Sequence, residues 1–185
     1  MNVIKTEKLT GNFVELHAMD QPHFSALTSL ANDKRIWQHY TFDGSDPSRF
    51  SQTLEQALIE REKGTQIPFV IFHKESKKII GSTRLMEIVP IHKKLEIGFT
   101  WIHPDHWGTA VNPECKLLLL THAFETMGVH PVQLRTDENN QRSRKAILKI
   151  GATFEGIIRN DMVRENGTKR NSAYFSIVDS EWKEV

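Results

Sequence analysis

The sequence predicts one α+β domain, residues 1–185, in which a mixed and mostly antiparallel central sheet is flanked by helices. Two helix-like segments come before a run of three strand-like segments, and this order is typical of a mixed sheet rather than a repeating strand–helix–strand array. Two further helices alternate with the remaining strands. The length of 185 residues, with 38% hydrophobic and 25% charged residues, is sufficient for one core of ordinary globular composition.

The N-terminal half is expected to contain two helices and three strands. A short helix is predicted over residues 22–31 and a longer one over 47–63. Asp46 can cap the second helix, Pro47 suits its first position and Gly64 follows its end. Apolar and polar residues then predict strands over 68–73, 79–88 and 95–102, with a turn over 75–78 between the first two.

The C-terminal half is expected to alternate helices and strands. Asn112 can cap a helix that has Pro113 in its first turn and ends at Gly128. Asn140 can cap a second helix that ends near residue 150. The remaining predicted strands are 132–136, 153–163 and 172–178, the last two joined through the turn-forming pair Asn166–Gly167.

Composition excludes several classes of function. The 24 basic and 23 acidic side chains nearly balance, so we expect neither nucleic acid nor an anionic membrane as a partner. One cysteine, Cys115, rules out an internal disulfide and is expected to be a packed thiol. The N-terminus lacks an apolar run of signal-peptide length, which favours a cytoplasmic protein. His103 and His106 lack a third ligand, so no metal is expected.

The segment from Trp107 to Glu114 is the most informative stretch of the chain. It joins the alternating strand 95–102 to a helix and contains the small residues Gly108 and Ala110. The first turn of a helix leaves its N–H groups unpaired and carries partial positive charge. A small-residue bend at that point therefore predicts an anion site built from main-chain amides.

These motifs, in this order, resemble the GNAT superfamily of N-acetyltransferases. The resemblance rests on the loop Asp105–Ala110, on the run Asn139-Asn140-Gln141-Arg142-Ser143, and on the run from Lys149 to Gly156. It covers about residues 10–182 and is closest to the branch that acetylates the N-terminal serine or alanine of ribosomal proteins. It implies a sheet splayed at the cofactor site and acetyl-CoA as the cosubstrate.

The resemblance also implies residue roles. The N–H groups of Gly108 to Asn112 would hold the pyrophosphate, and a backbone N–H between Thr100 and Ile102 would hold the thioester oxygen. Ser143 would act at the sulfur, because the following helix lacks the tyrosine that many members carry, and Asp105 replaces a usual basic or amide residue. Arg142 would bind the CoA 3′-phosphate or belong to a solvated helix face. The full set of expected cofactor contacts is Trp101, Ile102, Trp107, Gly108, Thr109, Ala110, Val111, Asn112, Asn140, Arg142 and Ser143.

Acetyl transfer needs a neutral amine and a group that accepts its proton. An α-amino group has a pKa near ~7.8 and a lysine near ~10.4, so an N-terminal amine requires only a modest base. Glu96 is the leading candidate, placed by alternation on a polar strand face shared with Gly98 and Thr100. The alternatives for Glu96 are a solvent-facing side chain or a pair with Arg84. Asp161 and Glu155 are rival bases.

The acceptor is expected to be a primary amine, with a protein N-terminus favoured over a small amine. The aromatic segment around Trp37, His39 and Tyr40 is interpreted as a wall of the acceptor site or as core cover, and Asp161 as a further contact. The acceptor amine would attack directly in a ternary complex. A catalytically silent acyl-CoA-binding regulator with the same fold is the alternative, and a homodimer is a possible assembly.

Overall fold

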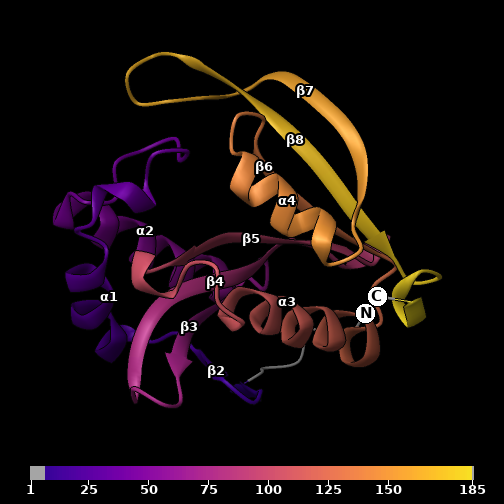
Figure 1. Ribbon diagram of the computed structural model, residues 1–185, viewed down its shortest axis with the longest axis horizontal. Helices are drawn as coiled ribbons and strands as arrows, with labels where there is room; N and C mark the ends of the chain where they lie inside the picture. Colours follow the sequence, from indigo (N-terminus) through magenta and orange to yellow (C-terminus); the bar gives the residue numbers. More distant parts are fainter. Residues whose placement is uncertain (1–6, 185) are drawn as a thin grey trace.

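The computed structural model describes residues 7–184 and contains one eight-stranded sheet with helices on both faces (Figure 1). The strands are β1 (Lys8–Thr10), β2 (Val14–Ala18), β3 (Ile67–His73), β4 (Lys78–Val89), β5 (Lys94–Ile102), β6 (Pro131–Asp137), β7 (Thr153–Val163) and β8 (Lys169–Val178). The α-helices are α1 (Phe24–Leu30), α2 (Pro47–Glu62), α3 (Val111–Thr121) and α4 (Gln141–Lys149). The order across the sheet is β1-β2-β3-β4-β5-β6-β8-β7. Every neighbouring pair is antiparallel except β5 and β6, which confirms the predicted class.

Two of the predicted helix starts have the expected caps. The Asp46 carboxylate accepts hydrogen bonds from the backbone N–H groups of Ser48 and Arg49, and Pro47 occupies the first turn of α2. The Asn140 side chain accepts from the N–H of Ser143 at 3.0 Å. Each cap satisfies N–H groups that the first helical turn leaves free, so local sequence fixes both starts.

The predicted cap of α3 is wrong. Ala110 is the N-cap residue, and Asn112 lies inside the first turn instead. Pro113 at the third position needs no hydrogen-bonded N–H there, so the helix can begin two residues earlier than the asparagine suggests. The helix continues through a π-helical turn, His122–Met127, and ends at Gly128 with φ of +66°, as predicted.

The two N-terminal strands were not predicted. β1 has only three residues and carries no clear pattern, whereas β2 alternates apolar and polar residues from Val14 to Ala18, a period-2 signal that was available and was missed. They form a hairpin that is tied to α3 by the Glu114 carboxylate, which accepts hydrogen bonds from the N–H groups of Asn12, Phe13 and Val14 at 2.7–2.8 Å. This long-range clamp places the sheet edge against the helix.

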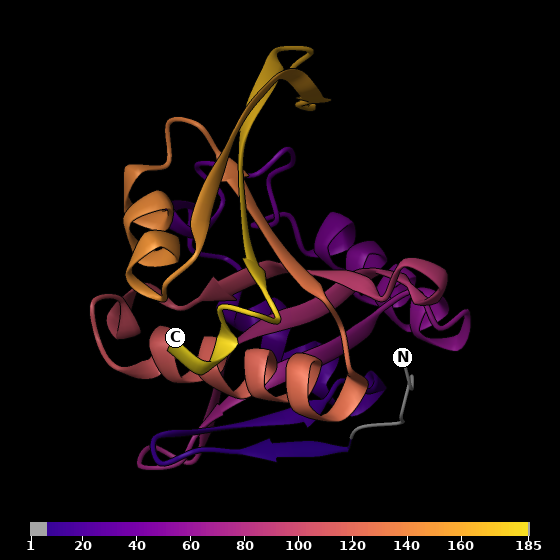
Figure 2. The same cartoon turned by 90° about the vertical axis from the view of Figure 1, so that its right-hand side faces the viewer.

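The core has two halves, one on each face of the sheet. On one face α3 and α4 cover the sheet with a buried cluster that includes Leu95, Cys115 and Leu119. On the other face α1 and α2 cover a second cluster that includes Phe50 and Trp101. The Cys115 side chain is fully buried, so it is the packed thiol that was expected, and burial raises the pKa of its thiol to about 12. Figures 1 and 2 show the β7–β8 hairpin projecting beyond these layers.

The centre of the sheet is splayed, as the resemblance implies. The parallel strands β5 and β6 are paired only at Leu95–Val132 and Glu96–Gln133. Beyond Glu96, β5 continues to Ile102 without pairing to β6. The two strands therefore separate toward the loop that leads into α3.

A bulge in β5 overturns one prediction about side-chain faces. Phe99 has φ of +47°, and the register with β4 shifts between Ser82 and Arg84. A bulge inserts a residue and reverses the alternation beyond it. Trp101 therefore joins the α1/α2 cluster, whereas Leu95 and Ile97 belong to the α3/α4 cluster. Thr100 instead contacts Lys116 of α3, so Glu96, Gly98 and Thr100 do not share one face.

Candidate active site

The loop before α3 presents free main-chain amides at the open end of the splay. Within the described part of the chain, the N–H groups of Gly108, Thr109, Ala110 and Asn112 have no hydrogen-bond acceptor, while the N–H of Val111 bonds Thr109 Oγ1 at 3.3 Å. Gly108 has φ of +75°, and a Cβ built there would meet no atom within 4 Å. The loop is thus open to a ligand, and its amides together with the N-terminus of α3 form an anion site.

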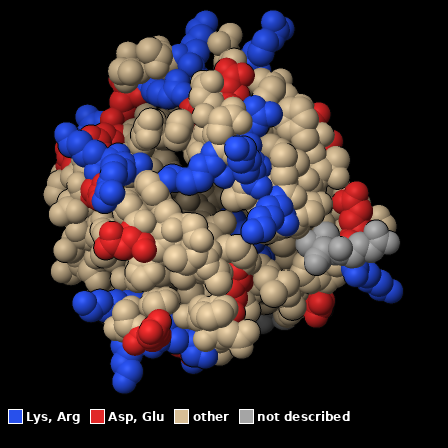
Figure 3. Space-filling view, viewed as in Figure 1, with Lys and Arg blue, Asp and Glu red and all other residues tan. Residues whose placement is uncertain are grey.

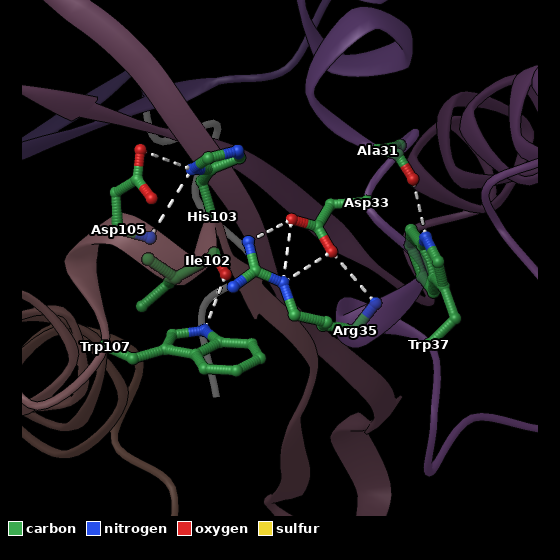
Figure 4. Close-up of polar contacts among 8 residues, drawn as sticks. All are labelled: Ala31, Asp33, Arg35, Trp37, Ile102, His103, Asp105 and Trp107. Carbon is green, nitrogen blue, oxygen red and sulfur yellow. Dashed lines mark hydrogen bonds and ion pairs between the residues drawn. The ribbon is translucent and has the colours of Figure 1, made fainter.

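Trp107 and Arg142 join this loop to α4. The Trp107 indole N–H donates to the Ile102 carbonyl at 2.8 Å, as Figure 4 shows, which fixes the ring at the end of β5. The Arg142 guanidinium carbon lies 3.4 Å from the centre of the Trp107 ring. A cation over an indole face is a favourable contact and holds Arg142 beside the anion site. Figure 3 shows basic side chains around a hollow on the face that carries α3 and α4.

Two more predicted cofactor residues lie at the N-terminus of α4, across the splay from β5. Asn140 caps the helix through Ser143, so the side-chain oxygen of Asn140 is engaged with the N–H of Ser143. Both residues are partly exposed. Their proposed contacts with pantetheine and sulfur therefore remain predictions.

The Asp33–Arg35 ion pair lies near the same region and was not predicted. In Figure 4 the Arg35 guanidinium is held by both carboxylate oxygens of Asp33. Asp33 keeps its charge readily because the hydrogen bond from Arg35 lowers the pKa of its carboxyl to about 2. The pair lies in the segment between α1 and α2.

Glu96 is buried in the splay and pairs with an arginine that sequence reasoning missed. Glu96 is 3% exposed, and its Oε2 lies 3.1 Å from Nε of Arg135 on β6. Burial raises the pKa of the Glu96 carboxyl to about 7, against the opposing pull of Arg135. The ion pair between Glu96 and Arg84, which was one of the expected alternatives, does not form. A carboxyl that titrates near neutral pH can accept a proton there.

Arg135 gathers residues from four strands. Its guanidinium also contacts Glu87 of β4 at 2.6 Å, the Tyr174 hydroxyl of β8 at 3.1 Å and Asp161 of β7 at 4.0 Å. Asp161, predicted as a substrate contact, thus belongs to the same cluster as Glu96. The rival Glu155 instead accepts a hydrogen bond from Ser176. No short-range pattern marks Arg135, because its partners are 26 to 48 residues away in the sequence.

Lys116 is a second residue that the sequence did not single out. It is 7% exposed, and its Nζ donates to Thr100 Oγ1 at 2.7 Å. Among the described residues no carboxylate lies within ion-pair distance of it. Burial lowers the pKa of its ammonium to about 8. Helical spacing places Lys116 on the same face as the buried Leu119 and Leu120, but lysine is ordinarily an exposed residue, so the residue type did not mark it as buried.

The predicted oxyanion region follows the β5 bulge. Trp101 and Ile102 are buried at 3% and 6% exposure, so their side chains support the strand while their backbone borders the splay. The Thr100 carbonyl accepts a hydrogen bond from the Tyr40 hydroxyl at 2.8 Å. This contact ties the aromatic segment to the bulge.

The aromatic segment divides into buried and accessible parts. Trp37 is 4% exposed and donates from its indole to the Ala31 carbonyl, so it packs in the core. Tyr40 and Phe42 are partly exposed and contact Phe99, while His39 is partly exposed nearby. Phe42 and Phe99 also line a groove of about 820 Å³ beside α2, and Glu165 of the β7–β8 turn is another of its lining residues. The substrate roles of these residues remain predictions.

Residues 7–184 contain neither a metal-binding cluster nor a membrane-spanning helix. No group of three or more His, Cys, Asp or Glu side chains there is arranged to hold a metal ion. No described helix has both the length and the apolar character that a membrane span requires.

Comparison with known proteins gives the relatives of this chain. It is 25% identical over 162 residues to the uncharacterized N-acetyltransferase YoaA of Bacillus subtilis (strain 168), covering 86% of this chain and 89% of that protein. It is 29% identical over 105 residues to YdaF of the same organism, a protein named as a ribosomal N-acetyltransferase; this match covers 57% of this chain and 56% of that protein.

Solved structures share the fold over nearly the whole chain. A probable GNAT-family acetyltransferase from Chromobacterium violaceum is 30% identical, with a TM-score of 0.85 over 96% of this chain and 88% of that one. The microcin C7 self-immunity acetyltransferase MccE, solved with acetyl-CoA and AMP, is 19% identical and shares the fold at a TM-score of 0.81, over 91% of this chain and 93% of that one. The model of the acetyltransferase (GNAT) domain matches residues 14–153. The chain therefore belongs to the GNAT family of acetyltransferases, which makes it an acyltransferase.

Proposed function

We propose that this protein transfers the acetyl group of acetyl-CoA to a primary amine by direct attack in a ternary complex, with a protein N-terminal α-amine as the favoured acceptor. The observation that carries the proposal is the set of four amides, at Gly108, Thr109, Ala110 and Asn112, that have no acceptor among residues 7–184 and lie at the open end of the β5–β6 splay. A diphosphate matches such a site because it offers several acceptor oxygens and negative charge.

The neighbouring residues fit the rest of a CoA molecule. Arg142, held over Trp107, can pair with a further phosphate beside the loop. Asn140 and Ser143 at the start of α4 face the other side of the splay and supply polar groups for the pantetheine arm and the sulfur. When bound, the thioester supplies the acyl group and a thiolate leaving group.

The chain's own residues would handle the charges of the reaction. A backbone N–H after the Phe99 bulge would donate to the developing oxyanion, a contribution of about 3 kcal/mol in comparable sites. Glu96, with its pKa raised to about 7, would accept the proton of the attacking amine, directly or through water. Ser143 would donate a hydrogen bond to the departing sulfur.

The groove beside α2 supports a peptide end as the acceptor. Its volume of about 820 Å³ exceeds the needs of a small amine, and both signs of charge line it. The relation to YdaF supports the same choice. A small amine is the second candidate, favoured by the carboxylates of Glu87, Glu96 and Asp161 around the single Arg135, which could attract a cation.

Release of CoA thiol from acetyl-CoA tests the function. The panel contains short peptides with free N-termini, the same peptides with blocked N-termini, and small amines such as spermidine. We expect release above background with free peptides and none with blocked ones. Release with small amines only would assign the second candidate. Binding of acetyl-CoA with no release for any amine would mark a silent regulator and end the proposal.

A further inference from the structure

Arg84 of β4 is a buried cation without an anionic partner. It is 5% exposed, and its guanidinium carbon lies 3.9 Å from the centre of the Phe99 ring. Its Nη atoms donate only to neutral oxygens, those of the Gln66 side chain and the Thr53 carbonyl, at 3.3 and 3.2 Å. These are long hydrogen bonds, and its Nε has no partner among the described residues.

Such an arrangement is costly unless something else completes it. A buried charge destabilises a fold when it lacks both an opposite charge and full hydrogen bonding. Within residues 7–184, no carboxylate of the protein lies within ion-pair distance of Arg84. Burial lowers the pKa of its guanidinium to about 10, in keeping with this lack of an anion.

The groove of about 820 Å³ gives a ligand access to Arg84. The other charged residues that line it are Asp46, Arg49 and Glu165, and Arg49 pairs with both carboxylates. Arg49 therefore offsets one of the two negative charges, and these three residues together keep one negative charge in excess. Among the described residues, Arg84 is left as the cation of the groove without an anionic partner, beside the stacked rings of Phe42 and Phe99.

We propose that Arg84 binds a carboxylate carried by the acceptor amine. A guanidinium matches a carboxylate in shape and can donate two parallel hydrogen bonds to it. A phosphate fits less well, because its greater charge would meet the carboxylates of Asp46 and Glu165 in the same groove. The proposal rests on the proposed function, since Phe99 lines the groove and also forms the bulge that borders the acyl site.

The carboxylate can come from either of two sources, an amino acid's own α-carboxylate or an acidic side chain near a peptide N-terminus. Two matched pairs separate them: serine with serinamide, and the amidated tetrapeptide Ser-Asp-Ala-Ala with Ser-Asn-Ala-Ala. We expect kcat/KM to favour the carboxylate member of at least one pair by about tenfold or more, the usual effect of a charge-assisted hydrogen bond. The pair that responds identifies the source.

Three variants assign the preference to Arg84. In Arg84→Gln the preference should fall to within about threefold, and Arg84→Lys should retain part of it because the charge remains. Arg61→Gln serves as the control, since Arg61 of α2 pairs with Asp20 and Glu62 and is not among the residues that line the groove; its preference should equal that of the unmodified protein. Unfolding midpoints and CoA affinity, measured on each variant, show that the fold and the cofactor site are intact.

Failure of this inference can be told apart from failure of the proposed function. Absence of a preference in both pairs, or a preference that survives in Arg84→Gln, overturns the role of Arg84 even if amines are acetylated. If no amine is acetylated, calorimetric titration of both matched pairs into CoA-saturated protein decides the point. Binding of the carboxylate member of at least one pair about tenfold tighter than its amide partner, lost in Arg84→Gln, supports the inference; equal binding within both pairs overturns it.

Discussion

The loop before α3 and the cluster around Arg135 lie at opposite ends of the same splay but are built in different ways. The loop presents main-chain amides of neighbouring residues, between 108 and 112, so its design is local. The cluster consists of side chains from β4, β5, β6, β7 and β8 brought together by the sheet. Local sites depend on backbone conformation, whereas assembled sites depend on register and burial. Substitutions should therefore separate the two regions.

The largest effect is expected at the assembled site. Glu96→Gln should lower kcat/KM for acetyl transfer by about 100-fold or more, the usual contribution of a general base. Because the pKa of Glu96 is raised to about 7, kcat/KM of the unmodified protein should rise as pH increases through 7, where the carboxyl ionises. Pre-steady-state or steady-state rates between pH 5.5 and 9 check this. The rise of kcat/KM near pH 7 should be absent from Glu96→Gln.

Glu87→Gln is the matched control for Glu96. Glu87 contacts the same arginine at 2.6 Å, but its side chain is half exposed. We expect a loss below about fivefold and an unchanged pH profile, because exposed ion pairs contribute little. Equal losses in both variants would mean that Glu96 only positions Arg135.

The next effect concerns the local site. Gly108→Ala places a side chain at φ of +75° beside the free amides and should weaken CoA binding by about tenfold or more. Gly64→Ala is an unusually close control, since Gly64 has φ of +72° and equally open surroundings at the end of α2. Both should lose about 1 kcal/mol of stability through backbone strain. Equal CoA affinities in the two variants would remove the loop from the binding site.

A smaller effect is expected at Lys116, which lies between the two regions. Its pKa falls from 10.5 to about 8 on folding, so the folded state holds this proton less tightly than the unfolded chain. Protonation of Lys116 therefore destabilises the folded state. Its contribution to the free energy of unfolding is most favourable above about pH 10.5 and is lost as pH falls to 8. Lys116→Met should raise the free energy of unfolding at pH 7 by about 1–3 kcal/mol.

The advantage of Lys116→Met should shrink as pH rises toward 10, and denaturant titrations at several pH values measure it. Lys149→Met, on the exposed end of α4, should show no such trend. A constant difference across pH would show that folding does not lower the pKa of Lys116.

The smallest effect is expected at the caps. Asn140→Ala and Asp46→Ala each remove a side-chain oxygen that accepts from the first helical turn, so each should cost about 1 kcal/mol of stability. If Asn140 also contacts the pantetheine arm, CoA affinity falls only in Asn140→Ala. Thermal unfolding and calorimetry of the two variants separate capping from binding.

This contrast also explains how far the sequence predicts the molecule. Asp46–Pro47, Asn140 and Gly128 predict helix ends because caps act within one turn, and they are confirmed. The Gly108 bend is predictable for the same reason. The Phe99 bulge is not, because a phenylalanine carries no signal for positive φ, and without the bulge the faces of Thr100 and Trp101 are assigned wrongly.

For a related reason, the sequence could not predict the partners of the candidate base Glu96. Alternation along β5 singles out Glu96 as a polar residue in a strand, but only the β5–β6 pairing places Arg135 next to it. Arg84 and Lys116 read as ordinary surface charges until burial is known. Sequence patterns thus predict the backbone site, and the three-dimensional structure is needed to find the buried charges.

The central claim is that main-chain amides at the Gly108 bend hold a diphosphate. Calorimetric titration with CoA and with pantetheine, which lacks the diphosphate, tests it most directly. We predict that CoA binds with a measurable heat and that pantetheine binds at least 100-fold more weakly, by the loss of roughly 3 kcal/mol or more of charge-assisted hydrogen bonds. Equal affinity for the two compounds, or no binding of CoA, would contradict the account.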